Sequence, residues 1–277
     1  MITCHLMGGL GNQLFQIFAT ISYAIKSRQK FNFLNKTTLN FGTIRYTYWN
    51  SFLIKLNFCL VDKFHTFITE IKEKNFNFNE FPIVLNENIM INGYFQSYKY
   101  FQDNYEIICK LIGLQTMKSS LLEKPSLKSV VNNFENTISM HFRIGDYKSI
   151  QNCHPLMTKE YYHKSLTLIT SLYSTNFTVL YFCENVDIND VNLIVDYLKQ
   201  EFPKLTFIRG DNTLEDWEQM LLMSCCHHNI IANSSFSWWG AYFNEWTNQI
   251  VCYPSIWFGP SINHNTNDLC PPLWNKI

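Results

Sequence analysis

The sequence predicts an α/β protein of two lobes, with a parallel sheet in the second lobe. Through the second half of the chain, short apolar runs of strand length alternate with longer segments whose apolar residues recur at helical spacing. The chain opens on the same order, with an apolar run, a glycine turn and a helical segment. With 277 residues, 47% of them hydrophobic, it can bury the cores of two small lobes.

In the first half of the chain, apolar residues recur at regular spacing at the start, but residues 40–88 show no clear period. A polar stretch around residues 118–136, with Pro125 inside it, marks the expected junction, so we expect lobes at 1–130 and 131–277. The expected elements of the first lobe are a strand at 2–7, a helix at 12–28, a short strand at 31–34, loops and small helices over 40–88, and a strand turning at Gly93 into a helix over 89–101.

The second half alternates from residue 137 onward. Strands separated by helices imply right-handed crossovers and a parallel sheet covered on both faces, with ligands at the carboxyl ends of the strands. The expected strands are 137–142, 177–183, 205–210, 229–232 and 249–254, and the helical segments between them are 161–173, 187–202, 213–228 and 234–246.

Composition excludes several classes of partner. The 22 basic and 22 acidic side chains give a net charge of zero, so no global field attracts nucleic acid or an anionic membrane. The nine cysteines form no CxxC pair, and the first residues lack the features of a signal peptide, so we expect reduced thiols in a cytoplasmic protein. No apolar run reaches the length of a membrane span.

The opening GGLGNQ turn fits neither standard phosphate-binding loop. A dinucleotide site needs a third glycine where Leu14 stands, and a P-loop needs a lysine and a hydroxyl residue where Asn12 and Gln13 stand. What remains is a turn at Gly9 and Gly11 that lets a ligand approach the backbone. Asn12 and Gln13 would present their amides there, at the start of a helix.

The segment NSSFSWWG is the most informative strand end. Asn233, Ser234 and Ser235 precede a helix, where free backbone N–H groups and the positive end of the helix dipole favour an anion. An ordinary helix N-cap, which needs only one such residue, is the alternative.

The strand at 137–142 ends in HFRIGDY, which places three polar residues on a buried element. Arg143 offers a fork of donors suited to phosphate, and Asp146 could orient it or act as a base. The alternatives are an Arg143–Asp146 ion pair that only closes a loop, and a His141 that is a core residue.

Together, GGLGNQLFQ, HFRIGDY and HHNIIANSSFSWWGAYF resemble glycosyltransferase family 11, the alpha-1,2-fucosyltransferases, and NGYFQSYKYF matches a further segment of that family. The resemblance runs from residue 7 to about residue 254. It implies a GT-B type fold of two facing Rossmann-like lobes, with the donor held mainly by the C-terminal lobe and the acceptor on the N-terminal side. The implied reaction is inverting transfer of L-fucose from GDP-L-fucose to the 2-hydroxyl of a galactoside, so the partners are a nucleotide sugar and a glycan.

Two departures from the family pattern bear on the donor sugar. Ile144 stands where the family often has a second arginine, and FCEN, with Glu184 and Asn185, stands where many members read FSDD. Transfer of another deoxyhexose, such as rhamnose or a viosamine-like sugar, is therefore an alternative, as is a catalytically silent sugar-binding protein.

The chemistry of such a transfer assigns roles to the remaining residues. The departing diphosphate must be stabilised by a metal or by fixed donors, and the chain has no DxD sequence; its near miss, Asp216-Trp217-Glu218, falls in a predicted helix. We therefore expect no metal or other cofactor. Arg143, the N–H groups after Asn233, and the hydroxyls of Ser234 and Ser235 would hold the diphosphate.

The remaining polar residues are assigned to the acceptor proton, the sugar, the nucleoside and packing. Asp146 is the leading general base because it is the only carboxylate in the three motif segments, although its equivalent in relatives could instead hold the arginine loop. His141 would contact the diphosphate or the sugar. Asp216 resembles a residue that contacts the nucleoside in related folds. The run Cys225, Cys226, His227, His228 is read as packing, because four consecutive residues cannot all face one tetrahedral zinc ion.

Overall fold

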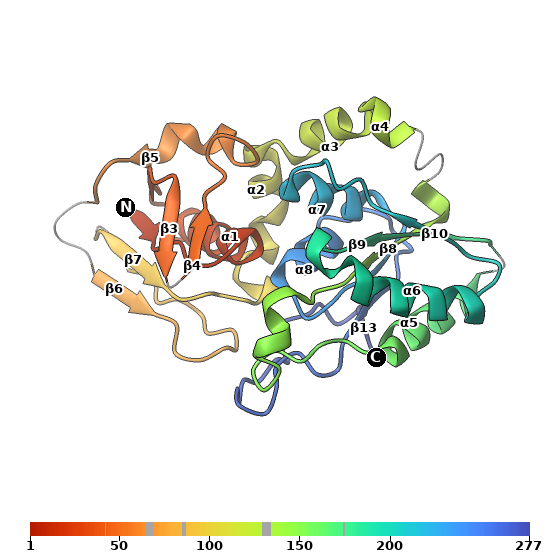
Figure 1. Ribbon diagram of the computed structural model, residues 1–277. Helices are drawn as coiled ribbons and strands as arrows, with labels where there is room; N and C mark the ends of the chain where they lie inside the picture. The colour runs from red at the N-terminus through yellow and green to blue at the C-terminus, as the bar shows by residue number, and fades with distance from the viewer. Residues whose placement is uncertain (42, 65–68, 85–86, 129–133, 174) are drawn as a thin grey trace. The chain divides into compact units, whose positions relative to one another are not determined.

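A computed structural model of the chain describes residues 1–41, 43–64, 69–84, 87–128, 134–173 and 175–277 (Figure 1). It divides into two compact units. Unit 1 consists of residues 1–117 and 264–271, and unit 2 of residues 118–263 and 272–277. Among the described residues, no helix combines the length and the apolar character needed to cross a membrane.

Unit 1 is built on a parallel sheet, as predicted. Its central sheet has the order β1 (Ile2–Cys4), β7 (Ile89–Asn92), β6 (Thr69–Lys72), with every pair parallel. Ile2 also bridges Phe31 in parallel, and β2 (Phe33–Leu34) follows that bridge and pairs with β5 (Leu60–Val61). Parallel pairing therefore continues from β6 to β5, which is the Rossmann-like arrangement expected of this lobe.

The helix α1 (Leu10–Lys26) forms the core of unit 1. Nearly all of its residues are buried, and Phe15 and Phe18 pack on Phe101 with ring centroids 6.0 and 5.5 Å apart. An apolar stripe this wide is typical of a helix covered by other elements along most of its surface.

The prediction for residues 40–88 was incomplete. Short strands occur there beside a 3-10 helix at Ile54–Cys59: β5, β6, and a β3 (Thr38–Phe41) and β4 (Thr43–Tyr46) antiparallel hairpin. Strands of two to four residues are too short to show a period of two. The helix expected before residue 101 was also misplaced, since only 3-10 turns occur near there and α2 (Tyr105–Ile112) begins later, ending at Gly113 with φ of 75°.

Unit 2 contains one sheet in which every pair is parallel, as predicted, but it has six strands, because the two-residue β13 was not expected from the sequence. Its order is β10 (Thr206–Arg209), β9 (Thr178–Phe182), β8 (Thr137–His141), β11 (His228–Ile230), β12 (Val251–Tyr253) and β13 (Asn275–Lys276). The crossover helices are α5 (Lys159–Leu172), α6 (Ile188–Glu201), α7 (Asp216–Cys225) and α8 (Ser235–Tyr242).

The alternation of side chains along β8 assigns the helices to the two faces of this sheet. Ile138 and Met140 join a buried cluster with residues of α5 and α6. Ser139 points the other way and accepts a hydrogen bond from Asn229, which also donates to the α7 carbonyl of Met223. Helices α5 and α6 therefore cover one face of the sheet and α7 the other, and His141 shares the face of Ser139.

The division between the units differs from the expected one at residue 130. Helix α3 (Leu114–Leu122) runs across the observed division between Met117 and Lys118. The buried ammonium of Lys118 donates to the carbonyl of Phe243 at the end of α8 and draws this part of α3 into unit 2. Within unit 1, Lys99 forms an ion pair with Asp268, and Phe76 stacks on His264. These contacts explain why residues 264–271 leave the C-terminal lobe to which they were assigned.

Candidate functional site

Arg143 lies just beyond the carboxyl end of β8 and is held between two carboxylates. Its Nη2 donates to Asp146 at 2.5 Å and its Nη1 donates to Glu184 at 2.5 Å. The Arg143 side chain is 20% exposed, whereas those of Asp146 and Glu184 are 54% and 58% exposed. The ion pair with Asp146 that the sequence offered as an alternative is therefore present, and Glu184 joins it. An anion that binds Arg143 must compete with these carboxylates for the guanidinium.

The guanidinium keeps its charge despite this position. Burial opposes the charged form, but Asp146, Tyr147 and Glu184 outweigh it and raise the pKa of Arg143 above its ordinary value. Arg143 is thus a permanent cation at the end of a parallel strand, where bound ligands are expected.

Tyr147 connects the arginine loop to the segment that begins at Asn233. The guanidinium carbon of Arg143 lies 4.8 Å from the centre of the Tyr147 ring, and the Tyr147 hydroxyl donates to the carbonyl of Asn233 at 3.3 Å. His154 stacks on the Tyr147 ring with centroids 4.7 Å apart. The two sequence motifs therefore meet through a tyrosine that the sequence analysis did not single out.

The same loop is anchored by a second acidic residue on the neighbouring strand end. Asp187 follows β9, is buried, and accepts a hydrogen bond from the Gly145 backbone N–H at 2.7 Å. Lys148 lies 3.6 Å from Asp187 and 2.7 Å from Asp190. Gly145 has φ of +34°, a conformation that L side chains rarely adopt, so its missing side chain allows the loop to turn here.

The serine segment caps a helix, as its alternative interpretation stated. The Ser234 hydroxyl accepts a hydrogen bond from the Phe236 N–H at 3.3 Å, at the N-cap of α8, and Ser235 is the first residue of that helix. The Asn233 amide donates to the carbonyls of Pro155 at 3.0 Å and Trp257 at 3.1 Å. Asn233 therefore braces the loops around the start of α8.

His141 and Asp216 occupy different parts of unit 2. His141 is buried, and burial, with Arg143 nearby, lowers its pKa to about 3, so its ring is neutral near pH 7. A neutral His141 can exchange a hydrogen bond with a ligand but adds no charge to bind a diphosphate. Asp216 begins α7, where Glu215 and Glu218 form a capping box, and its carboxylate accepts from the Trp217 N–H at 2.7 Å.

The predicted glycine turn belongs to unit 1. Its left-handed residue is Gly8, with φ of +76°, where an added Cβ would lie 2.4 Å from Asn12. Gly9 has open space instead, because nothing lies within 4 Å of an added Cβ. Gly11 is buried within the first turn of α1, so the room for a ligand is at Gly9.

The two amides of this turn are used within unit 1. Gln13 donates to the carbonyls of Gly8 at 3.0 Å and Tyr46 at 2.8 Å, and Asn12 accepts from Gln96 at 2.8 Å. These contacts fix the turn and the start of α1.

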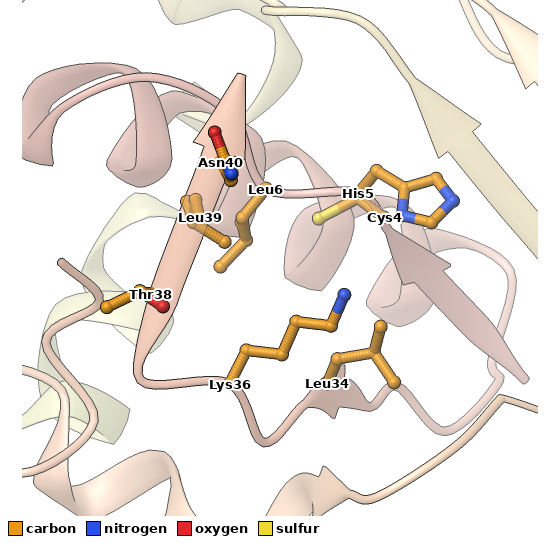
Figure 2. Close-up of a pocket in the computed structure, with 8 residues that line it drawn as sticks. All are labelled: Cys4, His5, Leu6, Leu34, Lys36, Thr38, Leu39 and Asn40. Atoms are coloured by element: carbon orange, nitrogen blue, oxygen red, sulfur yellow. The ribbon is translucent and has the colours of Figure 1, made fainter. Parts of the chain in front are cut away.

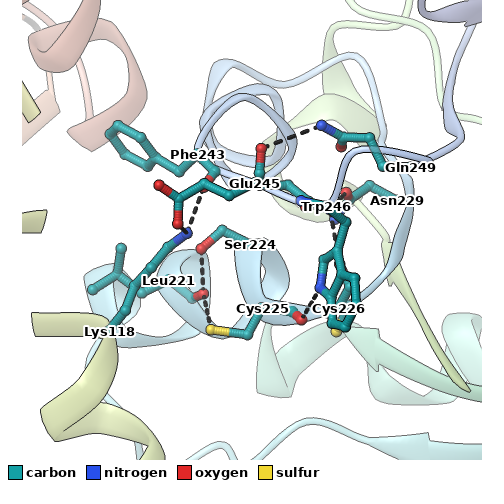
Figure 3. Close-up of polar contacts among 11 residues, drawn as sticks. Lys118, Leu221, Ser224, Cys225, Cys226, Asn229, Phe243, Glu245, Trp246 and Gln249 are labelled. Carbon is teal, nitrogen blue, oxygen red and sulfur yellow. Dashed lines mark hydrogen bonds and ion pairs between the residues drawn. The ribbon is translucent and has the colours of Figure 1, made fainter. Parts of the chain in front are cut away.

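The four residues of the Cys225–His228 run are engaged in packing and backbone contacts. Figure 3 shows this for Cys225 and Cys226, and the rings of His227 and His228 stack on each other. The Cys225 thiol donates to the Leu221 carbonyl at 3.3 Å, and the Trp246 indole N–H donates to the Cys225 carbonyl at 3.0 Å. Burial raises the pKa of both Cys225 and Cys226, which disfavours the thiolate form that a metal requires. Within the described part of the chain, no group of three or more His, Cys, Asp or Glu side chains is placed to hold a metal ion.

A family model described as Glycosyl transferase family 11 matches residues 1–257. The chain belongs to glycosyl transferase family 11. This confirms the family that the three motifs indicated, and it makes the protein a glycosyltransferase.

Two relatives of this family 11 glycosyltransferase extend over its whole length. An alpha-1,2-colitosyltransferase of Escherichia coli is 28% identical over 307 residues, covering 100% of this chain and 99% of the relative. The O-antigen biosynthesis glycosyltransferase WbnK of Escherichia coli is 27% identical over 319 residues, covering all of both proteins.

A solved structure supports the fold. The ADP-heptose LPS heptosyltransferase II of E. coli matches with a TM-score of 0.54 at 9% identity, covering 100% of this chain and 89% of that one. At this identity the likeness concerns the fold alone. Together with two units that each contain a parallel sheet, it confirms the expected GT-B class.

Proposed function

We propose that this family 11 glycosyltransferase transfers L-fucose from GDP-L-fucose to the 2-hydroxyl of a galactoside, with inversion at the anomeric carbon and without a metal ion. The family match carries the glycosyl transfer. The proposed donor is supported by the motifs of the alpha-1,2-fucosyltransferases, and the proposed linkage also by the name of the 28% identical colitosyltransferase.

The observation that carries the proposed donor site is the position of Arg143 in unit 2. A permanent cation follows β8, and Tyr147 joins its loop to the residue before the α8 N-cap. In the proposal, the diphosphate of GDP takes over guanidinium contacts now made by Glu184 or Asp146, and the first N–H groups of α8 supply further donors. Asn233, Ser234 and Ser235 shape that end of the site, and Asp216 reaches the nucleoside.

The proposed reaction is a single displacement. The acceptor 2-hydroxyl oxygen forms a bond to the anomeric carbon of fucose as the bond from that carbon to the phosphate oxygen breaks, and the electron pair leaves with GDP. Arg143 stabilises the charge that grows on the departing diphosphate. The acceptor proton passes to Asp146, whose 54% exposed side chain remains open to solvent. Glu184 is a second carboxylate on the same guanidinium and holds it in place before the donor binds.

Unit 1 is proposed to bind the acceptor. Its Gly9 leaves open space beside the start of α1, and the Gln13 and Asn12 amides keep that turn in place. The sequence assigned Gly9, Gly11, Asn12 and Gln13 of the same turn to the donor. Because the Asn12 and Gln13 amides are used within unit 1, that part of the proposal rests on backbone N–H groups of the turn.

Colitose is the second candidate for the transferred sugar, because a full-length relative is an alpha-1,2-colitosyltransferase. Colitose is L-fucose without the 3-hydroxyl, so the two donors differ by one hydrogen-bonding group. A site that binds the 3-hydroxyl rejects colitose strongly, whereas an apolar site discriminates little between them.

A donor panel tests the proposal. The protein is incubated with GDP-L-fucose, GDP-colitose, a rhamnose nucleotide and a viosamine-type nucleotide, and release of the nucleotide is measured with and without a galactoside. Release of GDP from GDP-L-fucose that a galactoside accelerates supports the proposal. Faster release from another donor would show that a different sugar is transferred. Binding of GDP without release from any donor would indicate a silent sugar-binding protein.

A further inference from the structure

Unit 1 contains a cavity of about 200 Å³ that the family motifs do not touch (Figure 2). Its volume is below the roughly 300–1,000 Å³ of sites for drug-sized ligands, so its occupant is about the size of one monosaccharide. The residues that line it are Cys4, His5, Leu6, Leu34, Lys36, Thr38, Leu39 and Asn40.

The cavity lies where a parallel sheet presents ligands. Cys4 is the last residue of β1 and Leu34 the last of β2, and His5, Leu6 and Lys36 follow these strand ends. The third wall comes from β3 at 38–40. Ligands of open α/β sheets bind beyond the carboxyl ends of the strands, so the position itself favours a binding site.

The lining combines an apolar floor with a polar rim. Leu6 and Leu39 are buried, and with Leu34 they offer a surface for the C–H groups of a sugar ring. Thr38 and Asn40 flank Leu39 on β3 and are exposed, so this edge of the cavity is polar and open to solvent. A few polar groups converging on an apolar wall are typical of small-molecule sites.

Lys36 gives the cavity its charge. Figure 2 shows its side chain extending from the loop after β2 into the space ringed by the other lining side chains. None of the eight lining residues is acidic. Across the residues that the structure describes, no carboxylate forms an ion pair with the Lys36 ammonium, so its charge is unmatched at the cavity.

We propose that this cavity binds one sugar residue that carries a negative charge, a carboxylate or a phosphate, with the charge on Lys36. The inference rests on the proposed function only in taking this sugar to be part of the acceptor glycan. An ammonium is a point charge that accepts either group, so the chemistry of the ligand is anionic rather than specific to one of the two.

A binding titration tests the cavity without relying on activity. Three probes differ only at carbon 6: methyl β-D-galactoside, methyl β-D-galacturonide and methyl β-D-galactoside 6-phosphate. Their binding is followed by ligand-observed NMR, with excess GDP present to occupy the proposed donor site. The variants are Lys36→Met, which removes the charge at similar length, Leu34→Trp, which places a larger side chain at the cavity, and Lys110→Met, a matched loss of charge on the exposed side of α2. Thermal melting checks that each variant is folded.

We expect the two anionic probes to bind the unsubstituted protein about two- to fivefold more tightly than the neutral one, as for an exposed ion pair. Lys36→Met should remove this advantage, and Leu34→Trp should weaken the binding of all three probes. Lys110→Met should leave both the advantage and the three affinities unchanged. The advantage should also fall as sodium chloride is raised. Preference for only one of the anionic probes supports the proposal and identifies the charged group.

Equal binding of all three probes by the unsubstituted protein would overturn the inference, as would an equal effect of Lys36→Met and Lys110→Met. Donor hydrolysis is measured in parallel and should be unchanged in the control variant Lys110→Met. Absence of hydrolysis in the unsubstituted protein contradicts the proposed function alone, because the titration does not depend on it.

Discussion

Replacement of Arg143 separates a donor-binding role from a purely structural one. Arg143→Ala removes two ion pairs, each to a carboxylate that is more than half exposed, and the contact with Tyr147. Exposed pairs contribute about 0.2–1 kcal/mol each and the cation–π contact about 0.5–1 kcal/mol. Unfolding free energy should therefore fall by about 1–3 kcal/mol, which a folded variant tolerates.

The loss of GDP binding in Arg143→Ala should be larger than this loss of stability suggests. A charge-assisted hydrogen bond contributes about 1.5–3 kcal/mol, which corresponds to roughly ten- to hundredfold in Kd. Because GDP must first displace Glu184 or Asp146 from the guanidinium, the lower end of this range is expected. If the contact strengthens as GDP departs, turnover should fall by about a further hundredfold, and Arg143→Lys, which lacks the fork of donors, should lose rate more than binding.

Isothermal titration with GDP and single-turnover transfer measure the two effects. Glu184→Gln is the matched control, because it weakens one of the same ion pairs but keeps the guanidinium. It should bind GDP at least as tightly as the unsubstituted protein. An unaltered Kd for GDP in folded Arg143→Ala, with only a lower melting temperature, would refute the assignment of Arg143 to the donor site.

Transfer or slow donor hydrolysis should persist in excess EDTA, because fixed donors are proposed to replace a cation; loss of activity that manganese restores would contradict this. Gly9→Val should fold normally, because an added Cβ there meets nothing within 4 Å, but it should weaken ligand binding. Gly8→Ala should instead lower the melting temperature. Normal ligand binding and normal transfer by Gly9→Val would show that the turn has only a structural role. Stability should fall between pH 6.5 and 3, because burial lowers the pKa of His141 and His228 to about 3 each and the unfolded chain binds more protons in this window. At pH 5 each histidine should lower the free energy of unfolding by about 2 kcal/mol relative to pH 7, as measured by urea unfolding, and His141→Asn should remove the contribution of His141. The same urea midpoint at pH 7 and pH 5 would contradict this.

The central strands of the unit 2 sheet could be predicted because they are buried. The runs that became β8 and β9 are five residues long, and the helices α5 and α6 that follow them have clear apolar periodicity. In unit 1 the strands β2 and β5 have two residues each, and the hairpin β3–β4 is largely exposed. Neither burial nor length then leaves a periodic signal in the sequence.

The candidate site was predictable in part for a related reason. His141, Arg143 and Asp146 stand together in the sequence, so one motif revealed them, whereas Glu184 follows the next strand along the chain. A signal for it was present, because β8 and β9 are adjacent and parallel and their carboxyl ends meet at one edge. The role of Tyr147 depends on the Asn233 carbonyl, and backbone partners leave no mark in a sequence.

The path of the chain between the units limits how the protein can be divided. The chain passes from one unit to the other at 117/118, at 263/264 and again at 271/272, so neither unit is a single stretch of polypeptide. A fragment that stops at Met117 lacks Asp268, the partner of Lys99, and a fragment that begins at Lys118 carries residues 264–271 without the unit they fold with. An expression clone of the proposed donor half must therefore leave out residues 264–271 and rejoin the chain at residue 272, so that β13 stays on the edge of its sheet.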